Sequence, residues 1–135
     1  PLRYQELGEA CPRGVREIAA ADLPQTVGDV VLARRDMGTS YHLAVTVDDV
    51  AQGITDVSRG ADLADATAIH LVLQRLLGLP TPRYHHHRLI RDAAGKRLAK
   101  RDDARALSLY RSQGIAALRQ EIGADRIVIP LPSAP

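Results

Sequence analysis

Two polar side chains, Tyr41 and Arg59, stand at the ends of two short apolar segments of the sequence. Tyr41 comes just before HLAVTV (residues 42–47), and Arg59 follows ITDV (54–57). If both segments are strands of one sheet, the phenol and the guanidinium lie at strand ends, where open α/β sheets bind ligands. An Arg fork can hold a carboxylate through two hydrogen bonds, so the pair predicts a carboxylate site. The alternative is an ordinary surface Arg and a half-buried Tyr.

A second candidate site is the cationic stretch GKRLAKR at residues 95–101, whose charges are Lys96, Arg97, Lys100 and Arg101. Four cations on a loop that starts with Gly could hold phosphate oxygens and stabilise charge during phosphoryl or nucleotidyl transfer. The alternative is a solvated basic loop, which is the more common origin of a charge run.

Three adjacent histidines, His85, His86 and His87, follow Tyr84. Because neighbouring residues of a strand point to opposite sides, the three imidazoles cannot all face one ion. Cys11 is the single cysteine, which excludes an internal disulfide and a Cys-rich zinc site. We therefore expect no metal site here.

Other chemistry-bearing residues give weaker signals. Asp48 and Asp49 invite Mg²⁺ binding or general-base catalysis, but a helix-capping role explains Asp48 more simply. His42 and His70 are isolated in the sequence, and we expect them at polar edges or in packing. The sequence contains no P-loop, nucleophile elbow or Cys–His dyad.

The composition predicts one globular domain with an aliphatic core. The chain has 135 residues, 45% of them apolar and 25% charged, with four Tyr and no Phe or Trp. A net charge of +2 and a pI of about 9.1 are a weak indication of an anionic partner such as a nucleotide or RNA. No apolar run approaches the roughly 20 residues that span a bilayer, and no signal peptide is visible. We expect a cytoplasmic protein with no membrane partner, and the sequence does not indicate its oligomeric state.

The chain begins at Pro1 and its single Met is Met37. This start predicts either a removed initiator Met or a piece of a longer protein.

Local patterns predict alternating strands and helices, followed by a mostly helical end, which is an α/β arrangement. The surest element is a helix over residues 67–77, with apolar residues at helical spacing and Gly78 and Pro80 after it. The other predicted helices are 12–21, 48–52, 103–111 and 115–122. The predicted strands are 29–34, 41–47, 54–58, 84–90 and one after 126, with a turn at 36–39.

Five blocks of the sequence together resemble the catalytic region of glutamyl-tRNA synthetase-like class I enzymes. They are GDVVLARRD, TSYHLAVTVDD, GITDVSRGADL, LQRLLGLPTPRYHHH and DAAGKRLAKRD, in this order between about Gly28 and Asp102. The resemblance is closest to the short branch of that family, the glutamyl-queuosine tRNA(Asp) synthetases. Leu63 stands in RGADL where the ordinary enzymes commonly have His, and too little chain follows Arg101 for an anticodon-binding domain.

The resemblance implies a fold and a domain organisation. Residues 1–78 are expected to form part of a Rossmann-type class I catalytic domain with the remnant of an inserted segment. Residues 79–135 are expected to form a small, mostly helical subdomain that carries the KMSKS-like loop.

The resemblance also implies a reaction. The family activates glutamate with ATP and Mg²⁺, and the short branch then places the glutamate on the queuosine base of tRNA(Asp). Tyr41 and Arg59 match the residues that hold the substrate glutamate. Lys100 matches the second Lys of the K-[ML]-S-K-[SR] loop, which contacts ATP. The other phosphate-loop positions are Arg97, Leu98, Ala99 and Arg101.

The sequence departs from the family pattern in three ways. The first ATP motif, His-[Ile/Val]-Gly-His, is absent from these 135 residues. Only Tyr4 and Cys11 could remain from the family's zinc knuckle, so zinc is not expected. Arg97 replaces the first Lys of the loop, and Ala99 replaces its Ser.

We therefore expect these residues alone to be catalytically inert, and we assign no catalytic residue. Two alternatives stay open: a truncated, non-catalytic paralogue that binds glutamate or tRNA, and a fragment of ordinary glutamyl-tRNA synthetase.

Overall fold

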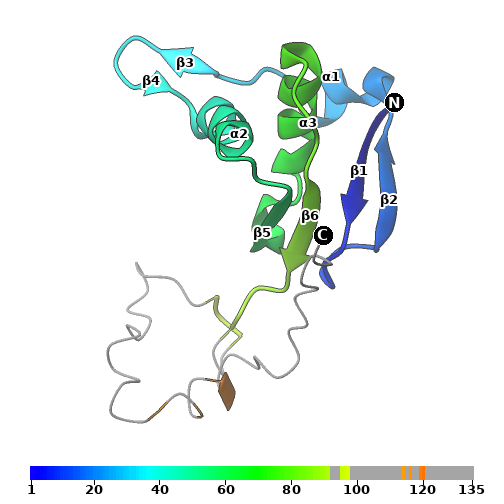
Figure 1. Cartoon of the computed structure of the whole chain (residues 1–135), viewed down its shortest axis with the longest axis vertical. Coiled ribbons are helices and arrows are strands. Elements are labelled where there is room, and N and C mark those ends of the chain that lie inside the picture. Colours follow the sequence, from blue (N-terminus) through cyan, green and yellow to red (C-terminus); the bar gives the residue numbers. More distant parts are fainter. Residues whose placement is uncertain (92–94, 98–113, 115, 117–118, 121–135) are drawn as a thin grey trace. The chain divides into compact units, whose positions relative to one another are not determined.

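The computed structural model describes residues 1–91, 95–97, 114, 116, 119 and 120. The chain divides into two compact units, Pro1–Leu89 and Ile90–Pro135. The first unit contains all the named helices and strands and is an α/β unit (Figure 1).

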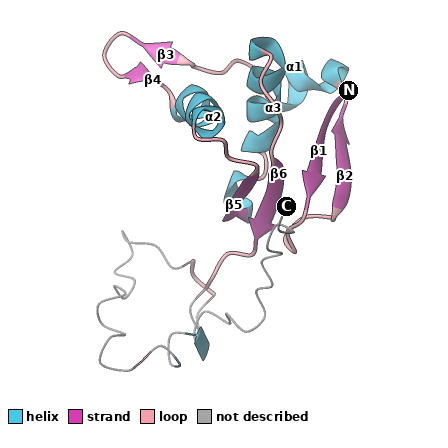
Figure 2. Ribbon diagram, viewed as in Figure 1, coloured by secondary structure: helices cyan, strands magenta, loops and turns pink. Residues whose placement is uncertain are grey.

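A four-stranded mixed sheet organises this unit, with the strand order β2-β1-β6-β5 (Figure 2). β1 (Leu2–Glu6) pairs antiparallel with β2 (Gly14–Ile18), and β6 (Arg83–His87) lies between β1 and β5 (Asp56–Gly60), parallel to both. The register sets Arg59 of β5 opposite His86 of β6.

The connection from β5 to β6 is a crossover through the 3-10 turn η2 (Ala61–Leu63) and helix α3 (Ala66–Leu77). The helix predicted over residues 67–77 is confirmed, and it ends at Gly78 in the left-handed conformation, with φ 66°. The predicted strands at 54–58 and 84–90 are also confirmed, as β5 and β6, with shifted ends.

Helix α2 (Tyr41–Ala51) packs against α3 and occupies the place of a predicted strand. The prediction of a strand at 41–47 followed by a one-turn helix at 48–52 is wrong, because one continuous helix covers both. The Ser40 side chain caps it by accepting a hydrogen bond from the Leu43 N–H at 3.5 Å. The near-continuous apolar run LAVTV suggested a strand buried on both faces, but a short apolar run does not distinguish a strand from a packed helix, and the weak strand preference of Val and Thr does not decide it.

The N-terminal region also differs from its prediction. The helix expected at 12–21 is wrong, since strand β2 occupies its centre, and β1 forms where no element was expected. Of the strand expected at 29–34, only β3 (Ala33–Arg34) forms, and it pairs with β4 (Gly38–Thr39) across the predicted turn. Two further short elements are the 3-10 turn η1 (Ala20–Asp22) and helix α1 (Leu23–Thr26).

β6, the strand predicted at 84–90, falls within the range 79–135 that was expected to form a mostly helical subdomain, and it is a strand of the main sheet. In the second unit, Arg91 and Arg97 form an isolated antiparallel bridge, and Ala116, Arg119 and Gln120 are helical, in line with the helix predicted at 115–122. The elements predicted at 103–111 and after 126 lie outside the described residues. None of the described helices is long and apolar enough to span a membrane.

The interior of the first unit is unusually polar. Its buried large hydrophobic side chains are those of Leu71, Leu73 and Tyr84. The buried polar residues of the described chain are Glu6, Thr46, Arg59, Thr67, His70, Gln74, His85 and His86. The fold therefore depends on hydrogen bonds in its centre as well as on apolar packing.

Gly8 lies where the chain leaves β1 and passes directly over the backbone of β6. A Cβ built at this position would lie 2.1 Å from the carbonyl oxygen of His86 and 2.4 Å from its nitrogen. These atoms belong to a paired strand, so they cannot move without disturbing the sheet.

We predict that Gly8→Ala lowers the free energy of unfolding by more than Gly53→Ala does. Gly53 has a φ of 68° but open space around it, so alanine there should cost only about 1 kcal/mol of backbone strain. Urea unfolding of both variants and the parent chain measures the difference. Equal losses would show that β6 does not press against Gly8.

Candidate functional site

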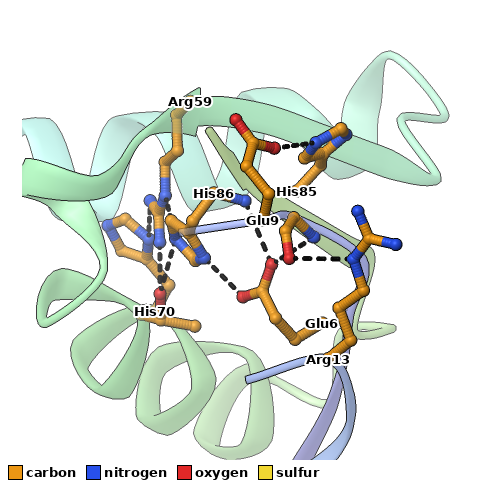
Figure 3. Close-up of polar contacts among 9 residues, drawn as sticks. Glu6, Glu9, Arg13, Arg59, His70, His85 and His86 are labelled. Atoms are coloured by element: carbon orange, nitrogen blue, oxygen red, sulfur yellow. Dashed lines mark hydrogen bonds and ion pairs between the residues drawn. The ribbon is translucent and has the colours of Figure 1, made fainter. Parts of the chain in front are cut away.

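The centre of the site is the guanidinium of Arg59 (Figure 3). Arg59 lies near the end of β5 and is only 8% exposed. Its Nε–H donates to His86 Nε2 at 3.1 Å and its Nη2 donates to Thr67 Oγ1 at 2.6 Å. Its Nη1 lies 2.9 Å from His70 Nδ1. The partners come from β6 and from α3, so the crossover that joins β5 to β6 builds the cage around Arg59.

The charge of Arg59 fixes the protonation of the ring beside it. A guanidinium is always protonated and can only donate, so His86 Nε2 must accept. The proton of a neutral His86 ring is therefore on Nδ1, where it faces Glu6 Oε2 at 2.5 Å. An imidazolium would instead direct a second donor at Arg59.

Glu6, at the end of β1, is fully buried and is held by backbone donors. Its Oε1 accepts from the Gly8 N–H at 2.8 Å and from the His86 N–H at 3.0 Å. Burial alone would raise the pKa of Glu6, but the hydrogen bonds from the His86 side chain and from these two N–H groups outweigh it and leave the pKa below its ordinary value. A buried carboxylate and a buried guanidinium thus balance each other through one neutral imidazole.

The tautomer of His70, on the other side of Arg59, follows from the same hydrogen-bond rule. His70 Nδ1 must accept from Arg59, so the His70 proton is on Nε2 and is directed at His42 Nδ1, 3.1 Å away. Burial lowers the pKa of His70 to about 4, and the charges of Arg59 and His42 lower it in the same direction. His70 is therefore neutral near pH 7.

Aromatic and amide groups complete the cage. The Arg59 guanidinium lies 5.0 Å from the centre of the Tyr84 ring, and the His86 ring stacks parallel to Tyr84 with centroids 5.9 Å apart. The Gln74 amide nitrogen donates to the Tyr84 hydroxyl at 3.1 Å. Gln74 Oε1 is buried and has no hydrogen-bond partner among the described residues.

Tyr41 and Arg59, the residues predicted to act together, line one small hollow. Tyr41 reaches it from the first turn of α2, so the expectation that both side chains come from strands is wrong for Tyr41. Tyr41 is 51% exposed, and its ring forms T-shaped contacts with the His42 and His70 rings, with centroids 5.5 and 5.9 Å apart. The hollow has a volume of about 20 Å³, and its lining residues are Tyr41, Val45, Thr46, Asp49, Val57, Arg59, His70, Gln74 and Tyr84.

Arg59 keeps hydrogen-bonding capacity for a ligand. A guanidinium has five N–H groups, and those that point to His86, Thr67 and His70 account for three. Counting contacts with the described residues only, one N–H then remains on each terminal nitrogen, which is the number that a bidentate carboxylate needs. Asp49 also lines the hollow, and burial raises the pKa of its carboxyl.

A metal ion does not fit these residues. Among the described residues, Glu6, Cys11 and His86 form a group whose ligand atoms lie within 4.8 Å of one another. Because His86 Nε2 accepts from Arg59, an ion would have to take Nδ1, and the ring proton would then point at the Arg59 Nε–H. Burial, followed by the charge of Glu6, raises the pKa of the Cys11 thiol, which also opposes binding as a thiolate.

The predicted phosphate loop is only partly described. Lys96 and Arg97 lie in the second unit. There the backbone of Arg97 forms an isolated antiparallel β-bridge with that of Arg91, and the Arg91 side chain donates to the Gly95 carbonyl at 2.9 Å. Leu98, Ala99, Lys100 and Arg101 lie outside the described residues. Their contact with ATP stays a prediction.

Sequence reasoning missed the cage around Arg59. The alternation rule places His85 and His87 on one side of β6 and His86 on the other, and the structure agrees: His85 faces Glu9 at 3.2 Å, whereas His86 faces Arg59. Thr67 and His70 are three residues apart on one face of α3, which could have marked them as a pair. Nothing in the local sequence distinguishes Glu6.

The fold is that of a class I tRNA synthetase catalytic domain. The family model described as tRNA synthetases class I (E and Q), catalytic domain, matches residues 17–122. The chain belongs to this family.

Curated relatives and solved structures agree with this assignment. A glutamyl-Q tRNA(Asp) synthetase of Rhodobacter capsulatus is 63% identical over 122 residues, which cover 89% of this chain and 44% of that protein. The protein of the same name from Ralstonia nicotianae is 54% identical over 99 residues, 73% of this chain and 31% of the relative. The chain thus spans less than half the length of these relatives.

A crystal structure of a glutamate tRNA ligase from Elizabethkingia meningosepticum, in complex with its amino acid, matches with a TM-score of 0.55 and 33% identity. The match covers 71% of this chain and 18% of that one.

We predict that the chain loses stability as the pH falls from about 6.5 to about 4, partly because of His70. The ordinary pKa of 6.5 drops to about 4 in the folded state, so the unfolded chain binds the proton first. Above pH 6.5 the neutral His70 makes its full contribution to the free energy of unfolding. This contribution falls as the pH falls, and about 3 kcal/mol is lost near pH 4. Urea unfolding across this range, compared between the parent chain and His70→Gln, isolates the effect.

The control for His70→Gln is His87→Gln, the same exchange at the end of β6, where Nδ1 lies 2.9 Å from the Arg88 carbonyl. His87→Gln should retain the parent's pH dependence. A His70→Gln chain with the parent's slope would contradict a neutral, buried His70.

Proposed function

We propose that this chain forms the glutamate-binding part of an enzyme that activates glutamate with ATP and transfers it to the queuosine base of tRNA(Asp). The observation that carries the proposal is the buried Arg59, with two N–H groups left for a carboxylate beside Tyr41. The names of the relatives supply the glutamyl-Q product and the tRNA(Asp) acceptor, and the family resemblance supplies the activation with ATP. The activity proposed is that of a complete catalytic domain, of which this chain corresponds to less than half.

In this proposal, Arg59 and Tyr41 recognise one carboxylate of the substrate. The guanidinium is held on three sides before any ligand arrives, so little conformational freedom is lost on binding. A hollow of about 20 Å³ admits a group the size of a water molecule, which suits a carboxylate oxygen. The rest of the glutamate would extend past the exposed Tyr41, whose hydroxyl can donate to the second oxygen.

The phosphate side of the reaction is proposed for the cationic loop. Lys100 would contact ATP, and Arg97, Leu98, Ala99 and Arg101 would complete the loop. Arg97 keeps the positive charge of the family Lys, whereas Ala99 loses a hydroxyl. Mg²⁺ prefers several oxygen ligands, which the described residues do not gather in one place, so we expect it to be held chiefly by the ATP phosphates.

Two other functions compete with this proposal. A non-catalytic paralogue would bind glutamate or tRNA without activating anything, and the altered loop with Ala99 favours it. A fragment of ordinary glutamyl-tRNA synthetase would charge tRNA(Glu). All three act on cytoplasmic substrates, and none requires a membrane.

The test is ATP–pyrophosphate exchange with glutamate by the protein that the complete reading frame encodes. We expect glutamate-dependent exchange, followed by transfer of labelled glutamate to tRNA(Asp) that carries queuosine and not to tRNA(Asp) that lacks it. Charging of tRNA(Glu) would favour the ordinary synthetase. Glutamate binding without exchange would contradict the proposed enzymatic activity and support the non-catalytic paralogue.

We predict that Tyr41→Phe raises the KM for glutamate in this exchange about three- to tenfold, the cost of one lost hydrogen bond. The kcat and the KM for ATP should stay unchanged. Because Tyr41 is half exposed, the variant should fold normally. Val47→Ala, at another exposed position of α2, is the control and should behave as the parent protein. An unchanged KM in Tyr41→Phe would remove the phenol from the site.

A further inference from the structure

We propose that Glu6 and His86 are positioning residues for Arg59, a carboxylate–imidazole pair that holds the guanidinium so that its two remaining N–H groups face the carboxylate ligand. This inference rests on the proposed function, because it assigns the pair a role in glutamate affinity. It adds two residues that do not touch the substrate.

The pair begins at a carboxylate whose place is fixed by the backbone. Two N–H groups, of Gly8 and His86, hold Glu6 Oε1, and backbone donors do not titrate. Only Oε2 remains, and it faces His86 Nδ1. The carboxylate can only accept, so it selects the His86 form that carries its proton on Nδ1.

The tautomer of His86 determines which group it presents to Arg59. With the proton on Nδ1, Nε2 is the acceptor that the Arg59 Nε–H requires at 3.1 Å. Thr67 Oγ1 lies 3.3 Å from the same nitrogen and accepts a hydrogen bond from Arg59 Nη2 at 2.6 Å. These two acceptors occupy one side of the guanidinium, and the Tyr84 ring lies 5.0 Å from its centre. The two unused N–H groups are therefore held in a defined direction.

A purely structural role would predict a different response to substitution. Glu6→Gln keeps the shape of the side chain and an oxygen for the two backbone N–H groups. Its amide nitrogen, however, would present a donor to His86 Nδ1. The His86 proton must then move to Nε2, where it opposes the Arg59 Nε–H, and the guanidinium has to leave its position.

The chain contains a matched control in Glu9. Glu9 forms a similar carboxylate–imidazole contact with His85, at 3.2 Å, and accepts from the Arg88 N–H at 3.0 Å. Neither contact involves Arg59. Glu9→Gln therefore makes the same chemical change on the other side of β6, without altering the acceptor offered to Arg59.

The first experiment measures the His86 tautomer by two-bond ¹⁵N–¹H correlation NMR on the 135-residue chain, with no substrate present. The parent chain and Glu9→Gln should carry the His86 proton on Nδ1, and Glu6→Gln should carry it on Nε2. An Nδ1 proton retained in Glu6→Gln, or found on Nε2 in the parent chain, would overturn the inference.

The second experiment measures exchange by the protein from the complete reading frame. Glu6→Gln should raise the KM for glutamate about tenfold or more, with the KM for ATP unchanged, and Glu9→Gln should match the parent. His86→Gln, which offers one donor and one acceptor like the imidazole, should recover part of the affinity that His86→Leu loses. If Glu6→Gln does not fold, this His86 pair of variants decides the question.

The outcomes separate the inference from the proposed function. A parent protein without glutamate-dependent exchange would overturn the proposed function and the substrate role of the pair, while the tautomer result would still stand on its own. An active parent protein whose Glu6→Gln or His86→Leu variant keeps the parental KM would overturn the inference alone.

Discussion

A positive charge taken out of water constrains the whole first unit. Desolvating a guanidinium costs several kcal/mol, and this cost is offset only if partners of suitable geometry surround it. Arg59 finds a negative charge in Glu6, but the two do not touch: His86 stands between them and bonds to both. Removing any member of this set would leave a buried polar group unsatisfied, so the three residues stabilise the fold only together.

The network also explains why the elements must assemble as they do. Its members come from β1, β5, β6, α3 and α2, so no pair of neighbouring elements contains it. The parallel pairing of β1 and β5 with β6 brings Glu6 and Arg59 to opposite sides of His86. Few large apolar side chains of the described residues are fully buried, so the arrangement also depends on the hydrogen bonds of this polar core.

The same arrangement links stability to recognition. A guanidinium that directs three of its five N–H groups to described residues of the protein is held in place, and the other two are left for the proposed ligand. Rigid donors recognise a carboxylate with little loss of entropy on binding. Under the proposed function, the polar interior supports the glutamate-binding site, which is placed at the small hollow lined by Tyr41 and Arg59.

The sequence by itself determined the family, through five blocks of residues, and the elements with strong local signals. The helix before Gly78 and the strands that carry Arg59 and His86 belong to this group, because spacing and stop residues act over a few neighbours. The sequence also marked Tyr41 and Arg59 as a pair, although it put Tyr41 on a strand. Tertiary structure decided that α2 is a helix, since the preference of β-branched residues is weak and packing against α3 overrides it. It also decided the partners of Arg59. Glu6 and His86 are 80 residues apart, and their contact depends on strand register and order, which no local pattern encodes.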